Sequence, residues 1–150
     1  MRVSAKGDYA CRAMLDMVIN RASDRPVQIQ EIAQRQNIPI KFLEQILVLL
    51  KKEGLLESRR GPGGGYLLAR NPADITVADV LKATDGPLFS AECSQLYGDD
   101  PATACPMLPN CVLHPVWDNV AKKVSEVLES VDFEQLAERY TQPKATMYYI

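Results

Sequence analysis

The chain has 150 residues, of which 47% are apolar and 24% charged, and its formal net charge is −2. This ordinary composition predicts one globular domain, or a small domain with an appended element, and excludes a fibrous or disordered chain. The apolar runs are too short to cross a bilayer, and the N-terminus has no apolar signal-peptide region. We therefore expect a cytoplasmic protein.

Charge is distributed unevenly along the chain. Residues 1–70 contain 12 Lys and Arg against 7 Asp and Glu, a net charge of +5. Residues 71–150 contain 5 against 12, a net charge of −7. A basic half beside an acidic half is consistent with one half facing a polyanion. A chance difference between two surfaces gives the same pattern, so charge supports a nucleic-acid partner without identifying one.

The first part of the chain predicts three helices in succession. Ser4 is expected to cap a helix that extends to about Asn20, with apolar residues repeating at three- and four-residue spacing. A second, short helix ends in a turn at Asn37. A third helix begins at Pro39, whose fixed φ is tolerated in a first helical turn, and extends to Glu53.

Two short strands are expected at residues 55–59 and 66–68. Between them, residues 60–65 contain four glycines and one proline, which excludes regular structure and predicts a hairpin tip. Gly54 is expected to end the preceding helix. The order of helix, helix, tight turn, helix and hairpin predicts a mainly α-helical winged helix-turn-helix domain, in which the last of the three helices enters the DNA major groove.

Candidate DNA-contacting residues lie at the start of the third helix, at the hairpin and near the N-terminus. Gln45 can pair with adenine edges and Lys41 with guanine or phosphate. The hairpin arginines reach phosphates or the minor groove, and the glycines beside them let the backbone approach the duplex. The set is Arg2, Lys6, Ile40, Lys41, Glu44, Gln45, Arg59, Arg60, Gly61, Gly63, Gly64 and Tyr66. The alternative is a solvated turn beside a small helical core.

The second half predicts a loop enclosed by helices. Thr76 is expected to cap a short helix ending at Thr84, and Asp132 a last short helix. Residues 90–115 form a loop, and an apolar stripe from Val116 to Val131 predicts a long amphipathic helix. This stripe needs a partner, and we expect a second copy of the chain. The division is therefore a winged-helix domain at 1–72, a cysteine loop with a dimerisation helix at 73–140, and a tail at 141–150.

Three of the four cysteines fall within this loop. Cys93, Cys105 and Cys111, followed by His114, offer donors for iron or zinc. In a reducing compartment, clustered cysteines indicate metal ligands or reactive thiols rather than structural disulfides. A zinc site and a thiol–disulfide sensor both remain open. Cys11, in the first helix, is interpreted as a core residue. We find no enzymatic motif and expect no catalytic residues.

Several motifs resemble the Rrf2 family of bacterial winged-helix transcription regulators, of the IscR/NsrR type. They are RGPGGGYLLAR at 60–70, the opening MRVSAKGDYA, IQEIA at 29–33 and FLEQIL at 42–47. The resemblance implies a homodimer that binds palindromic promoter DNA, represses or activates transcription, and senses iron or redox state through an iron–sulfur cluster.

The same resemblance implies that Cys93, Cys105 and Cys111 hold the cluster, with [2Fe–2S] favoured over [4Fe–4S]. The fourth ligand stays open. His114 matches the histidine ligand of the IscR type and is slightly favoured because it is local. Asp8 of the partner subunit matches the acidic ligand of NsrR-like members. The spacing from Cys93 to Cys105 is wider than in well-known members, which leaves the cluster geometry open.

Overall fold

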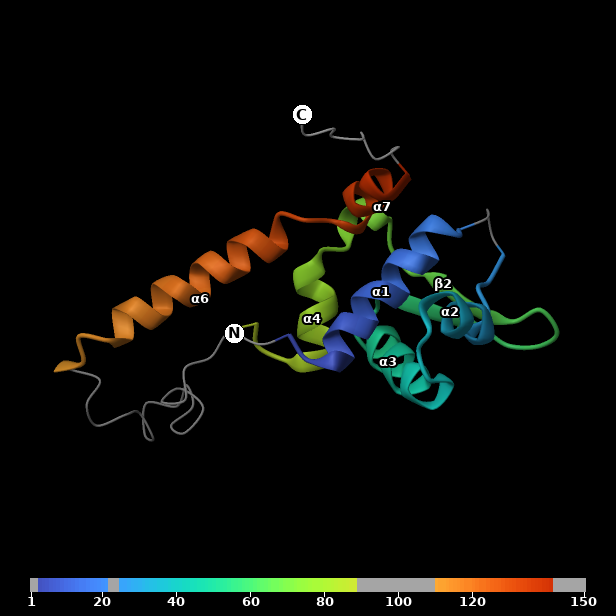
Figure 1. Cartoon of the computed structure of the whole chain (residues 1–150), viewed down its shortest axis with the longest axis horizontal. Helices are drawn as coiled ribbons and strands as arrows, with labels where there is room; N and C mark the ends of the chain where they lie inside the picture. Colours follow the sequence, from blue (N-terminus) through green and yellow to red (C-terminus); the bar gives the residue numbers. More distant parts are fainter. Residues whose placement is uncertain (1–2, 22–24, 89–109, 142–150) are drawn as a thin grey trace, which may run out of the picture.

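The computed structural model describes residues 3–21, 25–88 and 110–141, which form a helical body, a hairpin wing on one side and one long helix projecting away from the body (Figure 1). The elements are α1 (Ala5–Ile19), α2 (Ile29–Gln36), α3 (Ile40–Lys52), β1 (Leu56–Arg59), β2 (Gly65–Leu68), a 3-10 turn (Pro72–Asp74), α4 (Val77–Asp85), α6 (His114–Glu129) and α7 (Phe133–Thr141). The predicted winged helix-turn-helix with a long C-terminal helix is confirmed.

Helix α1 lies at the centre of the body. The Ser4 hydroxyl caps it by accepting a 2.9 Å hydrogen bond from the Gly7 N–H, as predicted. Its inward residues, spaced by three and four, are fully shielded from solvent and contact α2, α3, α4 and α7. They are Ala10, Ala13, Met14 and Met17. Because this apolar stripe is buried, the other helices of the body pack around α1.

The turn between α2 and α3 rests on local backbone geometry. Asn37 takes the left-handed conformation, with φ of 52°, and the Ile38 N–H then reaches the Ala33 carbonyl at 3.0 Å. Ile38 is buried, which fixes the turn to the core. Pro39 stands just before α3 instead of inside its first turn, and the helix begins one residue later than predicted.

Helix α3 ends at Lys52, and the predicted glycine follows its C-cap residue, Glu53. Gly54 has φ of 68°, and its N–H bonds the Lys51 carbonyl at 3.0 Å. The Leu55 N–H bonds the Leu50 carbonyl, also at 3.0 Å. This pair of bonds satisfies the last carbonyls of the helix and turns the chain into the wing.

The wing is an antiparallel hairpin with a third segment beside it. Strands β1 and β2 pair from Leu56 with Leu68 to Arg59 with Gly65. The Val27 and Tyr66 backbones exchange two 2.9 Å hydrogen bonds, so the chain before α2 extends the sheet. This bridge was not predicted, because a single residue gives no strand pattern. It joins the wing to the start of the helix-turn-helix.

The C-terminal helix α7 packs back onto the body. Phe133 is fully buried, its N–H bonds the Ile75 carbonyl at 3.0 Å, and the Val77 N–H bonds the Val131 carbonyl at 2.9 Å. The predicted capping box of α4 is confirmed, since Thr76 and Asp79 exchange their hydrogen bonds. The core therefore includes residues of α4 and α7 together with the three N-terminal helices.

Helix α6 begins at His114, two residues before the predicted start, with Pro115 in its first turn. None of its residues is buried in the described chain.

No helix in the described ranges is both long and apolar enough to cross a membrane. The predicted loop lies largely outside the described residues, and so does the predicted tail apart from Thr141, which ends α7.

Candidate nucleic-acid interface and metal ligands

The first turns of α3 present one side to solvent and the other to the core. Lys41, Glu44 and Gln45 are exposed, and Ile40 is 44% exposed. The opposite side of the helix is fully buried through Leu43, Ile46, Leu47 and Leu50. Pro39 has no N–H, and no side chain caps the start of α3 within the described chain. The start of α3 and the side chains predicted to contact DNA are therefore both exposed to solvent.

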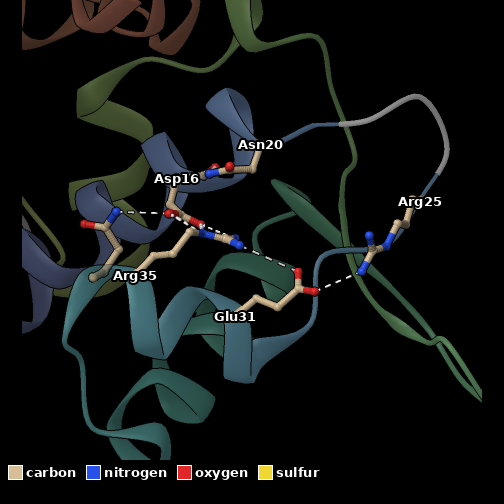
Figure 2. Close-up of polar contacts among 6 residues, drawn as sticks. Asp16, Asn20, Arg25, Glu31 and Arg35 are labelled. Carbon is tan, nitrogen blue, oxygen red and sulfur yellow. Dashed lines mark hydrogen bonds and ion pairs between the residues drawn. The ribbon is translucent and has the colours of Figure 1, made fainter.

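A buried carboxylate attaches α2 to α1 (Figure 2). Asp16 is 2% exposed and accepts hydrogen bonds from Arg35 Nε at 2.9 and 3.1 Å, from Arg35 Nη2 at 2.7 Å and from Gln36 Nε2 at 3.0 Å. This bonding, chiefly the hydrogen bond to Asp16, raises the pKa of Arg35. Arg35 also faces Glu31 at 3.7 Å, and Glu31 binds Arg25 at 2.9 Å. The chain of alternating charges holds the helix-turn-helix against α1.

The wing tip combines two exposed arginines with glycines that have different roles. Arg59, Arg60, Gly61 and Gly63 are exposed, and the two glycines have φ of 101° and 74°, which other residues rarely adopt. Gly64 is half-buried, and a Cβ there would collide with backbone atoms of the turn. The tip therefore requires glycine for the shape of its turn.

Two contacts fix the wing relative to the helices. Lys51, near the end of α3, donates a 2.6 Å hydrogen bond to the Ser58 hydroxyl in β1. Tyr66 is half-buried against the core and carries the backbone pairing with Val27. Tyr66 therefore has a structural position in the wing, and its predicted role in DNA contact stays a prediction.

The N-terminal end of α1 contacts the end of α4. Asp85 accepts hydrogen bonds from the Ser4 hydroxyl at 2.6 Å and from the Ser4 N–H at 3.2 Å. Gly7 is in close contact with α4, because a Cβ there would lie 2.6 Å from a carboxylate oxygen of Asp85. Lys6 is half-buried and lines a groove of about 540 Å³ at this junction. Arg2 lies outside the described residues.

Two of the four predicted cluster ligands can be placed. Cys111 has a free, half-buried thiol, and His114 follows it as the first residue of α6. His114 Nδ1 lies 3.0 Å from Asp118 Oδ2. Cys93 and Cys105 lie outside the described residues, and within the described ranges no three potential ligands are grouped. Cys111 and His114 are therefore placed three residues apart in the chain, and the ligand set stays a prediction.

Asp8 and Cys11 lie on α1 and have partners there. Asp8 pairs with Arg12 at 2.9 Å, one turn along the helix. Cys11 packs against the core, as predicted. Burial, with the nearby carboxylates of Asp8 and Asp85, raises the pKa of the Cys11 thiol to about 12. This thiol therefore stays protonated and unreactive at neutral pH.

Comparison with known proteins identifies the family. Residues 3–139 match the model of Rrf2, an iron-dependent transcriptional regulator. The chain belongs to the Rrf2 family. A relative from Xenorhabdus nematophila, the HTH-type transcriptional regulator IscR, is 37% identical over 136 residues, covering 91% of this chain and 79% of that protein. This chain is accordingly a transcription regulator of the Rrf2/IscR type, and its relatives are regulators rather than enzymes.

Solved Rrf2-type structures have the same fold. CymR, the global cysteine regulator of B. subtilis, is 31% identical and superposes with a TM-score of 0.74, covering 95% of this chain and 99% of that one. T. potens IscR is 34% identical with a TM-score of 0.71, covering 99% and 97%. CymR is described as a cysteine regulator, and an IscR has the same fold, so the fold alone does not identify the signal.

The sequence did not indicate three of the contacts that organise the site. The Asp16–Arg35 pair and the Ser4–Asp85 contact join residues far apart in the chain. Asp118 could have been found, because it stands four residues after His114 on a helix, where the two side chains meet.

Proposed function

We propose that this Rrf2 protein binds palindromic promoter DNA as a homodimer and that an iron–sulfur cluster controls its affinity. The exposed start of α3 and the exposed glycine-rich tip of the wing support the DNA interface. In this arrangement Lys41 and Gln45 meet base edges, while Arg59, Arg60 and Lys6 reach the backbone. Arg2, outside the described residues, is proposed for the same role.

A matched pair of lysines tests this interface. Lys41→Ala, at the exposed start of α3, is expected to weaken operator binding, and Lys52→Ala, at the far end of the same helix, to leave it unchanged. Arg60→Ala is expected to weaken binding to all duplexes alike. It should also reduce the slope of log affinity against log salt concentration by about one, which corresponds to the loss of one phosphate contact. Equal operator binding by the two lysine variants would contradict the proposed orientation, in which the start of α3 faces the DNA.

The projecting helix α6 supports the homodimer. Its apolar side chains line a shallow groove of about 420 Å³, and Val127 is 63% exposed. An amphipathic helix with such a face needs a partner, and two copies of α6 provide one for each other. Val127→Asp is expected to give a monomer in sedimentation, whereas Lys122→Asp, on the polar face, keeps the dimer. A monomeric wild type would refute the proposal.

Cys93, Cys105, Cys111 and a fourth ligand would hold the cluster. The described donors fit this group, because a free thiol and an imidazole lie three residues apart at the start of α6. A bound cluster supplies a redox-active centre whose presence depends on iron supply and oxidants. [2Fe–2S] is favoured over [4Fe–4S]. Either His114 or Asp8 of the partner subunit completes the set.

The chain's own contacts provide a route from the cysteines to DNA. Cys111 and His114 stand at the free end of α6, and the other end of α6 leads into Phe133, which is buried in the winged-helix body. Holding the free end would fix the angle between the two winged helices of a dimer, and so the half-site spacing that they span. An allosteric effect of about 5- to 150-fold on operator affinity is the usual range.

The deciding experiment is an anaerobic visible spectrum with iron and sulfide analysis, followed by operator binding with and without the cluster. Visible absorption, matched iron and sulfide, and different affinities of the two forms support the proposal. A protein that stays colourless after reconstitution, or equal affinities of both forms, would overturn the cluster sensor and leave the DNA interface standing.

A thiol or zinc sensor on the same fold is the second candidate, favoured by the likeness to CymR, the global cysteine regulator. Such a sensor would use the loop cysteines, because the raised pKa of Cys11 keeps that thiol unreactive. Zinc or disulfide forms are colourless, so metal analysis and a free-thiol count on the same sample separate the two candidates.

A further inference from the structure

One carboxylate is directed at a proposed cluster ligand. Asp118 stands one helical turn after His114 on α6, and its Oδ2 lies 3.0 Å from His114 Nδ1. A carboxylate accepts only, so a hydrogen bond across this contact would need Nδ1 to be the donor, and the proton of the neutral ring would then be held there. The lone pair is then on Nε2. Pro115, in the first turn of α6, restricts the backbone that carries this ring.

We propose that Asp118 is a positioning residue that presents Nε2 of His114 as the fourth ligand of the cluster. This inference rests on the proposed function. A metal-binding histidine almost always donates its other N–H to a carboxylate or carbonyl, which fixes the tautomer and ring orientation and raises the basicity of the ligating nitrogen. His114 and Asp118 bring the two atoms of such a contact to within 3.0 Å of each other on α6.

The rival ligand has a different environment. Asp8 is paired with Arg12 at 2.9 Å on its own helix, so binding a cluster would require it to leave a cation that already neutralises its charge. Binding through Nε2 would leave the contact between His114 and Asp118 in place, because Asp118 lies at the other nitrogen. His114 is also three residues from Cys111, whereas Asp8 would have to come from the partner subunit.

The first test uses the protein without cluster. The chain has one histidine, so isotope-labelled histidine gives a single imidazole in nitrogen NMR spectra. At a pH where the ring is neutral, the wild type is expected to show the tautomer protonated on Nδ1. Asp118→Ala, which keeps a good helix former, should lose that preference, and Asp118→Glu should restore part of it. Glu126→Gln, another acid on α6, is the matched control. Identical tautomers in wild type and Asp118→Ala would overturn the inference.

The second test uses the loaded dimer. Pulsed EPR of the reduced cluster with nitrogen-15 histidine is expected to show a directly bound imidazole nitrogen, absent in His114→Ala and retained in Asp8→Asn. Asp118→Ala should lose iron to a chelator about 10- to 100-fold more readily. A loaded wild type without this coupling excludes His114 as a ligand, and equal retention of iron in Asp118→Ala excludes the role of Asp118. Either result leaves the proposed cluster standing. A wild type that takes up no iron and sulfide overturns the proposed cluster itself.

Discussion

Replacing Asp16 by asparagine tests whether the buried carboxylate holds the helix-turn-helix in place. Asparagine keeps the shape and one acceptor oxygen, but it removes the charge and turns an amide donor toward Arg35 or Gln36. Breaking a buried ion pair by removing one partner costs about 3–5 kcal/mol. Water partly solvates the side chain of Arg35, which is 36% exposed, so the cost falls to the bottom of this range or just below it, and we expect a loss of about 2–3 kcal/mol.

For a chain of this size, 1 kcal/mol corresponds to roughly 2–4 °C, so the melting temperature should fall by about 5–10 °C. Thermal and urea unfolding of Asp16→Asn, Arg35→Gln and the double variant measure both the loss and the coupling, which should exceed about 1 kcal/mol. Lys82→Ala, which breaks an exposed pair between α4 and α6, is the control and should leave the melting temperature nearly unchanged. A loss below about 0.5 kcal/mol, or additive effects, would refute the reasoning.

Three further predictions concern local features of the body. Because the pKa of Cys11 is about 12 instead of 9.0, its thiolate fraction at neutral pH is roughly a thousandfold lower, and alkylation followed by mass spectrometry should find it the slowest cysteine. The folded protein keeps the Cys11 proton up to about pH 12, whereas the unfolded chain loses it near pH 9.0. Between these values the free energy of unfolding should therefore fall more for the wild type than for Cys11→Ala. Gly65→Ala would drive a Cβ into the Val27 backbone, and unfolding and operator titrations should show losses in both stability and affinity. Thr76→Ala removes the capping hydroxyl of α4 and should lower the free energy of unfolding by about 1 kcal/mol.

Features that depend on neighbours in the chain were predicted well. The Ser4 cap, the turn at Asn37, the glycine after α3 and the capping box at Thr76 each follow from a few adjacent residues. The winged-helix order followed from these elements together with the glycine-rich tip. The start of α6 was placed at Val116 because the apolar stripe begins there, whereas a proline is also tolerated in the first helical turn.

Features that depend on distant pairing were missed for a physical reason. Asp16 has no sequence signal that separates a buried acid from an exposed one, because its burial comes from Arg35 and Gln36 on another helix. Val27 joins the wing through a single bridge, which produces no alternating pattern. In the sequence, Phe133 is one apolar residue of a predicted short helix. Its role as the anchor of α7 depends on backbone pairing with Ile75, which is distant in the chain.

Helix α1 connects the proposed sensor to the proposed DNA interface, because contacts from both sides converge on it. The segment that carries the cysteines is preceded by α4, whose Asp85 binds Ser4 at the start of α1. It is followed by α6 and α7, and Glu134 of α7 binds Arg21 just beyond the end of α1 at 3.0 Å. Between these two contacts, Asp16 holds the helix-turn-helix through α2. We therefore expect a change that moves α4 relative to α7 to shift α1, and with it α2 and α3, which pack against α1.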